Sequence, residues 1–175
     1  MRYAAFLRGV NVGGVNLKMA DLTSALSAAG FGSVRTVLAS GNVLLEASDD
    51  SAASVRDGVE TALRQRFGYE AWALVYDMST VRSIAEGYPF PEAVDWHSYV
   101  TFVGDLAVLD ELAALAPPAG RPERIARGDG VLYWQVPRSG TLDSTIGRTM
   151  GRKRYKASTT TRNLRTLGKV LHAAL

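Results

Sequence analysis

The sequence predicts an α/β fold whose first half forms a βαββαβ, ferredoxin-like unit. Three observations support this prediction: apolar runs of strand length, amphipathic stretches of helical period between them, and glycine-containing turns where they meet. The chain has 175 residues, of which 47% are hydrophobic and 21% charged. This composition is that of a globular protein with a substantial core.

The first half reads as four strands and two helices. Residues 3–7 form an apolar run between two arginines, which is typical of a buried strand. The first helix is expected to be capped by Asn16 and ended by Gly30. We then expect a hairpin, with strands at residues 34–39 and 43–47 on either side of the turn at 40–42. A second helix is expected at residues 55–67 and a fourth strand at 71–76. Right-handed crossovers give this order the split βαβ arrangement.

The second half repeats the pattern less completely. A strand is expected at residues 98–103, and Gly128-Asp129-Gly130 marks a hairpin. Beyond it, the threonines at 159–161 are expected to cap a last helix. We therefore predict a first ferredoxin-like subdomain, a second and incomplete one, and a basic helical C-terminal segment that packs back on both, over residues 1–78, 79–137 and 138–175.

Charge is unevenly distributed along the chain. Residues 1–136 contain eleven Lys and Arg against sixteen Asp and Glu, whereas residues 137–175 contain nine against one. A basic segment of this kind either binds phosphates or forms a solvated face against the acidic part of the chain. Both interpretations remain open at this stage.

Several function classes are excluded or weakly supported. The absence of cysteine excludes disulfides and thiolate metal sites, and with only His97 and His172 we predict neither a metal nor a cofactor. Whether the protein is an enzyme stays open, because the sequence has no GxSxG or HExxH motif. No apolar run reaches the roughly 20 residues of a membrane span, and no signal-peptide core is evident, so a cytoplasmic protein is expected.

Several motifs resemble those of one bacterial family. They are Leu7-Arg-Gly-Val-Asn-Val-Gly-Gly14, Lys18-Met-Ala-Asp-Leu22, Gly30-Phe31, Val34-Arg-Thr36, Ser40-Gly-Asn42 and, near the end, Thr160-Thr-Arg-Asn163 with Thr166. In this combination they resemble the family called domain of unknown function 1697. The family usually has an aromatic residue where this chain has Leu164. The resemblance implies two ferredoxin-like subdomains and implies no activity.

The first candidate site is an edge of the first sheet. Because the first two strands should run parallel, the end of the first strand and the turn after the second should share one edge. A glycine-rich loop before a helix can also present backbone N–H groups to an anion. We therefore expect a phosphate-bearing small molecule or a nucleotide to bind at the edge formed by residues 9–16, residues 40–42 and the C-terminal Thr-Arg-Asn helix, with ligand-binding residues Arg8, Asn11, Gly13, Gly14, Ser40, Asn42, Arg162 and Asn163.

Two alternatives remain. In the first, the basic segment 148–169 binds nucleic acid, with Tyr155 stacking on a base and phosphates held by Arg152, Lys153, Arg154, Lys156 and Arg165. In the second, the chain is a protein-interaction module without a small ligand. The sequence does not predict an oligomeric state.

Overall fold

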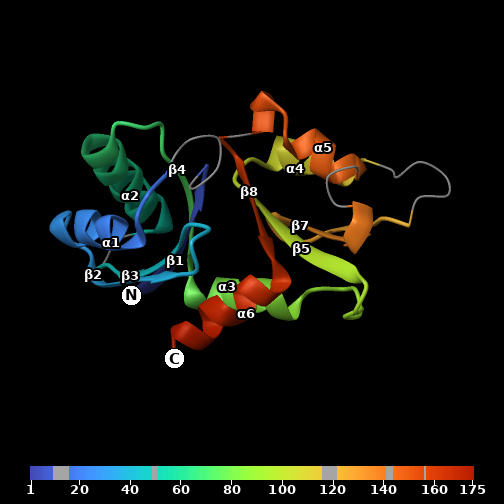
Figure 1. Cartoon of the computed structure of the whole chain (residues 1–175), viewed down its shortest axis with the longest axis horizontal. Coiled ribbons are helices and arrows are strands. Elements are labelled where there is room, and N and C mark those ends of the chain that lie inside the picture. Colours follow the sequence, from blue (N-terminus) through green and yellow to red (C-terminus); the bar gives the residue numbers. More distant parts are fainter. Residues whose placement is uncertain (10–15, 49–50, 116–121, 141–143, 156) are drawn as a thin grey trace. The chain divides into compact units, whose positions relative to one another are not determined.

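We describe a computed structural model of the chain, which covers residues 1–9, 16–48, 51–115, 122–140, 144–155 and 157–175. It consists of two compact units, formed by residues 1–82 with 168–175 and by residues 83–167. Each unit contains a four-stranded antiparallel sheet with helices (Figure 1). The chain is therefore a mixed α/β protein with two ferredoxin-like subdomains, as the sequence predicts.

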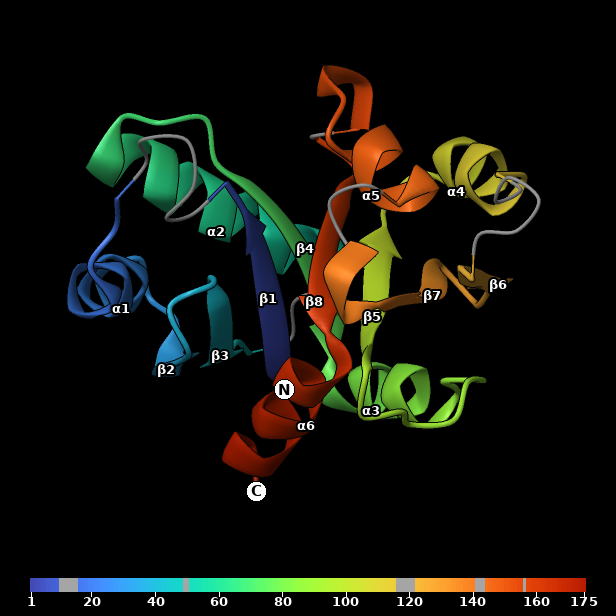
Figure 2. The same ribbon diagram turned by 45° about the vertical axis from the view of Figure 1, so that its right-hand side comes forward.

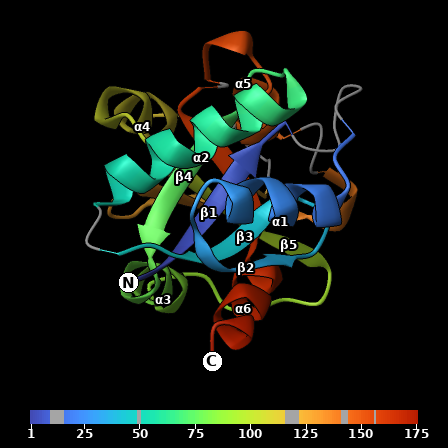
Figure 3. The same ribbon diagram turned by 90° about the vertical axis from the view of Figure 1, so that its left-hand side faces the viewer.

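The first unit has the strand order β2-β3-β1-β4. Both β1 and β2 pair antiparallel with β3, so β1 and β2 run parallel, as the split βαβ arrangement requires. Helices α1 and α2 cover one face of the sheet (Figure 3). The elements of this unit are β1 (Arg2–Arg8), α1 (Met19–Ala28), β2 (Gly32–Val37), β3 (Asn42–Glu46), α2 (Ala52–Phe67) and β4 (Trp72–Asp77).

The core of the first unit is built by side chains that alternate along the strands and recur at helical spacing along the helices. Alternate residues of β1 point to the covered face, where they meet residues of α1 and α2 that recur at helical spacing. The Ser51 side chain caps α2 by accepting a hydrogen bond from the Ser54 backbone N–H. The expected Asn16 cap of α1 is wrong, because the helix begins at Met19 after Lys18, which makes no side-chain cap.

The second unit has the equivalent order β6-β7-β5-β8. Figure 2 shows α4 and α5 beside its strands, and apolar side chains of both helices pack with those of β7. The elements that follow β4 are α3 (Met78–Glu86), β5 (Trp96–Val103), α4 (Leu106–Ala113), β6 (Arg124–Arg127), β7 (Val131–Pro137), the 3-10 turn η1 (Arg138–Gly140), α5 (Thr145–Met150), the 3-10 turn η2 (Lys153–Tyr155), β8 (Thr159–Asn163) and α6 (Leu164–Ala173).

The C-terminal part of the chain is organised differently from the prediction. β8 pairs with β5, so β5-α4-β6-β7-α5-β8 is a complete βαββαβ unit rather than an incomplete one. The threonines expected to cap a helix form this strand instead, since β-branched side chains suit a sheet and the Thr161 hydroxyl lies 2.8 Å from that of Thr101 on β5. Residues 138–163 thus belong to the second unit, and 138–175 is not a separate basic helical segment.

In the part of the chain that the structure describes, no helix has the length and apolar character needed to cross a membrane. The same residues contain no group of three or more side chains suited to binding a metal ion.

Candidate functional site

Arg8 and the turn at residues 40–42 lie at the same end of the first sheet. Phe6 on β1 pairs with Asn42 on β3, and the Leu7 backbone N–H donates to the Gly41 carbonyl at 2.8 Å. The predicted convergence of Arg8 with Ser40 and Asn42 is therefore confirmed at the level of the backbone. The other three residues expected at this edge, Asn11, Gly13 and Gly14, lie outside the described residues.

The Asn42 side chain stabilises the turn. It is buried, and its Nδ2 donates to the Val37 carbonyl and to the Ser40 hydroxyl, both at 2.8 Å. In the connection between β2 and β3, Leu38 and Gly41 have φ angles of 61° and 82°. Half-burial of Arg8 nearby lowers the pKa of its guanidinium through desolvation. These contacts explain the turn without a ligand.

Of the two residues expected at a helix N-terminus, Asn163 lies there and Arg162 does not. Arg162 lies on β8 opposite Val100, and its guanidinium is buried with 7% of the residue exposed. Its Nη1 donates to the Thr160 hydroxyl at 2.7 Å and to the Thr161 carbonyl at 2.9 Å. Asn163 is the last residue of β8 and caps α6, because its Oδ1 accepts from the Arg165 backbone N–H at 2.9 Å. The expected Arg162 at a helix N-terminus is thus a strand residue.

The basic segment 148–169 is only partly exposed. Arg154 pairs with Glu111 of α4, while Arg152 and Lys153 are exposed. Tyr155 belongs to the core of the second unit, and its hydroxyl donates to Glu111 at 3.2 Å. The expectation that Tyr155 stacks on a base is therefore wrong, since only 7% of the residue is exposed. Lys156 lies outside the described residues.

A pocket of about 190 Å³ lies within the second unit, at the end of its sheet where β8 stops and α6 begins. It brings two residues of the sequence-based expectation, Asn163 and Arg165, together with side chains that are distant in sequence. The lining residues are Glu92, Ala93, Trp96, His97, Ser98, Arg138, Asn163, Leu164 and Arg165. The sequence did not predict Arg138 and Glu92 as site residues. Each follows a proline, Pro137 and Pro91 respectively, and the sequence has no other feature that marks them.

The backbone around this pocket is held by hydrogen bonds. The fully buried Gln135 of β7 donates through Nε2 to the Pro91 carbonyl at 2.9 Å and to the Ser98 hydroxyl at 3.1 Å. The Trp96 N–H donates to the Ala93 carbonyl at 3.1 Å. The Arg138 N–H donates to the Asp95 carbonyl at 2.9 Å. The loop before β5 and the turn after β7 are therefore tied to each other and to the sheet.

Aromatic contacts position two further lining residues. The Arg124 guanidinium lies 4.6 Å from the centre of the Trp96 ring, a cation–π contact. The same guanidinium donates to Gln135 Oε1 at 2.9 Å. The His97 ring contacts Tyr99 with centroids 5.7 Å apart, and Tyr99 stacks on Trp134 at 4.4 Å. Trp96 and His97 thus line the pocket from fixed positions.

The charged side chains of the pocket do not neutralise one another. Across the described residues, no salt bridge involves Arg138, Arg165 or Glu92. Other arginines of the chain, such as Arg64 and Arg127, do have carboxylate partners. Arg138, Arg165 and Glu92 therefore line one small pocket, and none of them is paired with an opposite charge among the described residues.

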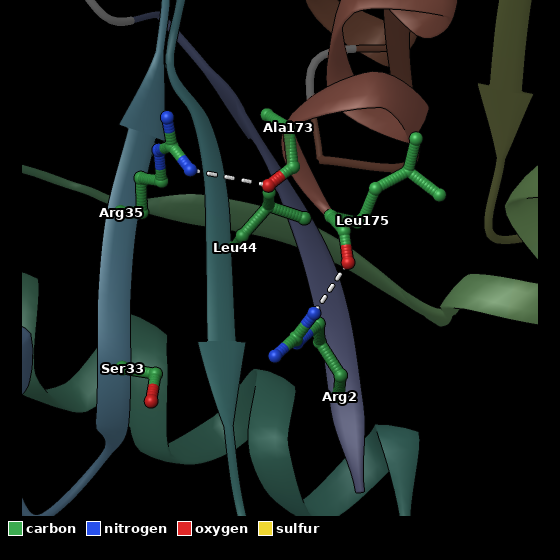
Figure 4. Close-up of a pocket in the computed structure, with 7 residues that line it drawn as sticks. Arg2, Ser33, Arg35, Leu44, Ala173 and Leu175 are labelled. Carbon is green, nitrogen blue, oxygen red and sulfur yellow. Dashed lines mark hydrogen bonds between the residues drawn. The ribbon is translucent and has the colours of Figure 1, made fainter.

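A second pocket, of about 170 Å³, lies within the first unit. Figure 4 shows Arg35 of β2 and Arg2 of β1 directed toward the last turn of α6, where they donate to the carbonyls of Ala173 and Ala174. Arg2 also pairs with Glu46 at 2.9 Å. Because helix C-termini carry partial negative charge, these arginines stabilise the end of α6, and we interpret this pocket as structural.

Taken together, the fold and the pockets define a two-unit ferredoxin-like α/β protein with a small, charged pocket in its second unit. A family model described as protein of unknown function (DUF1697) matches residues 1–133. The chain belongs to this family, as its motifs indicate.

The solved structure of the conserved bacterial protein SP0830 from Streptococcus pneumoniae is similar over nearly the whole chain. The TM-score is 0.81 at 21% sequence identity, and the alignment covers 98% of this chain and 97% of the other. At that identity the likeness supports the fold alone. No curated protein matches the chain.

Proposed function

We propose that the protein binds a small anionic ligand, such as a phosphate-bearing molecule, in the pocket of the second unit. Arg138 and Arg165 would provide the positive charge, and Asn163 and His97 would donate or accept hydrogen bonds. The observation that carries this proposal is the pair of arginines, Arg138 and Arg165, that line one pocket without a carboxylate partner among the described residues. A planar guanidinium suits phosphate and carboxylate groups because it can donate two parallel hydrogen bonds.

The volume of the pocket limits the size of the ligand. Pockets that enclose drug-sized molecules have volumes of roughly 300–1,000 Å³, whereas this one has about 190 Å³. A phosphoryl group with a few further atoms fits this space better than a whole nucleotide. The proposal therefore keeps the phosphate-bearing small molecule expected from the sequence and moves its main contacts to the second unit, in the cytoplasmic location that the sequence predicts.

Nucleic-acid binding has less support. Arg154 is paired with Glu111, and the Tyr155 ring is buried, which leaves exposed Arg152, Lys153 and Arg165 as the described part of the expected patch. Binding to DNA or RNA through these residues would weaken steeply between 50 and 200 mM salt, in proportion to the phosphates neutralised. A one-to-one small-ligand site would instead saturate and raise the melting temperature.

The proposal is tested by titrating the full chain with inorganic phosphate and a monoalkyl phosphate, monitored by NMR chemical shifts at constant ionic strength. We expect Arg138→Ala and Arg165→Ala each to weaken binding by about tenfold, since each removes a charge-assisted contact. Arg148→Ala is the matched control, because Arg148 is exposed on α5 and does not line the pocket. Equal losses in all three variants would point to unspecific charge attraction and would count against the proposal.

A further inference from the structure

Glu92 lies in the same pocket as the two arginines. Its carboxylate is exposed, yet within the described residues it forms a salt bridge with neither Arg138 nor Arg165. A pocket for a simple anion has no need of a carboxylate, and a negative charge there lowers the affinity for an anion. The pocket thus presents both signs of charge to whatever enters it.

The backbone on either side of Glu92 is anchored. The preceding carbonyl, that of Pro91, accepts from the buried Gln135 amide, and the following carbonyl, that of Ala93, accepts from the Trp96 N–H. The backbone N–H groups of Arg138 and Arg165 are also bonded. The three charges therefore project from fixed backbone positions, which reduces the entropy lost when a ligand orders them.

We propose that the ligand is zwitterionic: a small molecule that carries an anionic head and a primary ammonium group, such as an aminoalkyl phosphate or an amino acid. The anionic head would bind between Arg138 and Arg165, and the ammonium would bind the Glu92 carboxylate. This inference rests on the proposed function, because it assigns the second charge of a ligand whose first charge occupies the same pocket. Residues of opposite charge that line one pocket favour a dipolar ligand over a plain anion.

Two pairs of nearly isosteric probes test the inference. O-Phosphoethanolamine is compared with propyl phosphate, and β-alanine with butyrate, so that each pair differs mainly in the presence of the ammonium group. The full chain is titrated at pH 7 and constant ionic strength, monitored by NMR chemical shifts, as wild type and as Glu92→Gln. Glu86→Gln is the control, since Glu86 is an exposed glutamate of α3 outside the pocket.

We expect at least one ammonium-bearing probe to bind about three- to fivefold more tightly than its partner, the range of a partly exposed charge pair. Glu92→Gln should abolish this preference, leave the affinity for the plain anion equal or higher, and leave the spectrum otherwise folded. The pair of probes that shows the preference for the ammonium group identifies the anionic head of the ligand as a phosphate or a carboxylate.

The outcomes separate the two proposals. Plain anions that bind as tightly as their ammonium-bearing partners in both pairs, or a preference that survives in Glu92→Gln, overturn the zwitterionic ligand and leave the proposed anion site standing. Absence of binding by all four probes overturns both. A preference lost equally in Glu86→Gln would also overturn the inference, because the effect would then reflect overall charge.

Discussion

The buried side-chain amide of Gln135 donates to the Pro91 carbonyl at 2.9 Å, which fixes the loop that carries Glu92 to the central strand β7. The same side chain also donates to Ser98 and accepts from Arg124. One polar residue in the core of the second unit therefore holds the loop that carries Glu92, the lining residue Ser98 and the arginine that contacts Trp96. Buried amides of this kind stabilise a structure only when their partners are all present.

We predict that Gln135→Leu lowers the free energy of unfolding by about 1–3 kcal/mol, because the substitution leaves buried partners without a hydrogen bond. The same variant should weaken phosphate binding, since the loop before β5 loses its anchor. Urea denaturation and the NMR titration measure the two effects. Gln65→Leu, at an exposed position of α2, should change stability by less than about 0.5 kcal/mol. Unchanged binding in Gln135→Leu would show that the loop is held by other contacts.

A second prediction concerns the buried hydroxyl of Thr101. It accepts from Trp134 Nε1 at 2.9 Å and lies 2.8 Å from the Thr161 hydroxyl on β8. Thr101→Val keeps the shape but removes both contacts, so we expect a loss of about 1–3 kcal/mol of stability in chemical denaturation. Thr101→Ser keeps the hydroxyl and loses only the methyl group, so it is the control for Thr101→Val. If the serine variant is the less stable of the two, packing of the methyl group outweighs the hydrogen bonds.

A third prediction concerns pH and the start of α3. The pKa of Asp77 is lowered, first by the hydrogen bond from the Ser79 hydroxyl at 2.6 Å and then by that from the Thr80 backbone N–H at 2.9 Å. A lowered folded-state pKa means that the contribution to stability is present above the unfolded pKa of about 3.9 and is lost as pH falls through the folded value.

Asp77→Ala should therefore destabilise the protein by about 1 kcal/mol at pH 7, the usual effect of removing a helix cap. The difference from wild type should shrink as pH falls below about 4. Asp77→Asn keeps a capping side chain, and its effect should vary less with pH. Thermal denaturation over pH 3–7 measures both, and a difference that grows on acidification would contradict this account of the cap.

A fourth prediction concerns the last turn of α6. Arg35 Nη1 donates to the Ala173 carbonyl at 3.3 Å, and Arg2 donates to that of Ala174. Removing both arginines should increase hydrogen exchange at residues 168–175 by up to about tenfold, because the last carbonyls lose their partners. Mass spectrometry of peptic fragments measures this exchange. Arg56→Ala with Arg66→Ala, on α2, removes the same charge elsewhere and should leave these residues unaffected.

The first sheet was largely predictable because its signals are local. The apolar run of β1, the Ser-Gly-Asn turn and the helical spacing of α2 each mark their element, and the parallel course of β1 and β2 follows from crossover handedness. From this alone Arg8, Ser40 and Asn42 could be assigned to one end of the sheet. Where signals compete, as in the threonines of β8, the sequence supports both a helix cap and a strand.

The amino-acid sequence by itself determined the α/β class, the ferredoxin-like order of the first unit and the basic character of the C-terminal part, because composition and periodicity act over a few neighbouring residues. Only the tertiary structure decided that β8 completes the second sheet, that Arg162 and Tyr155 are buried, and that Glu92, Arg138 and Arg165 share one pocket. Those outcomes depend on long-range strand pairing, which brings together residues more than seventy positions apart along the chain.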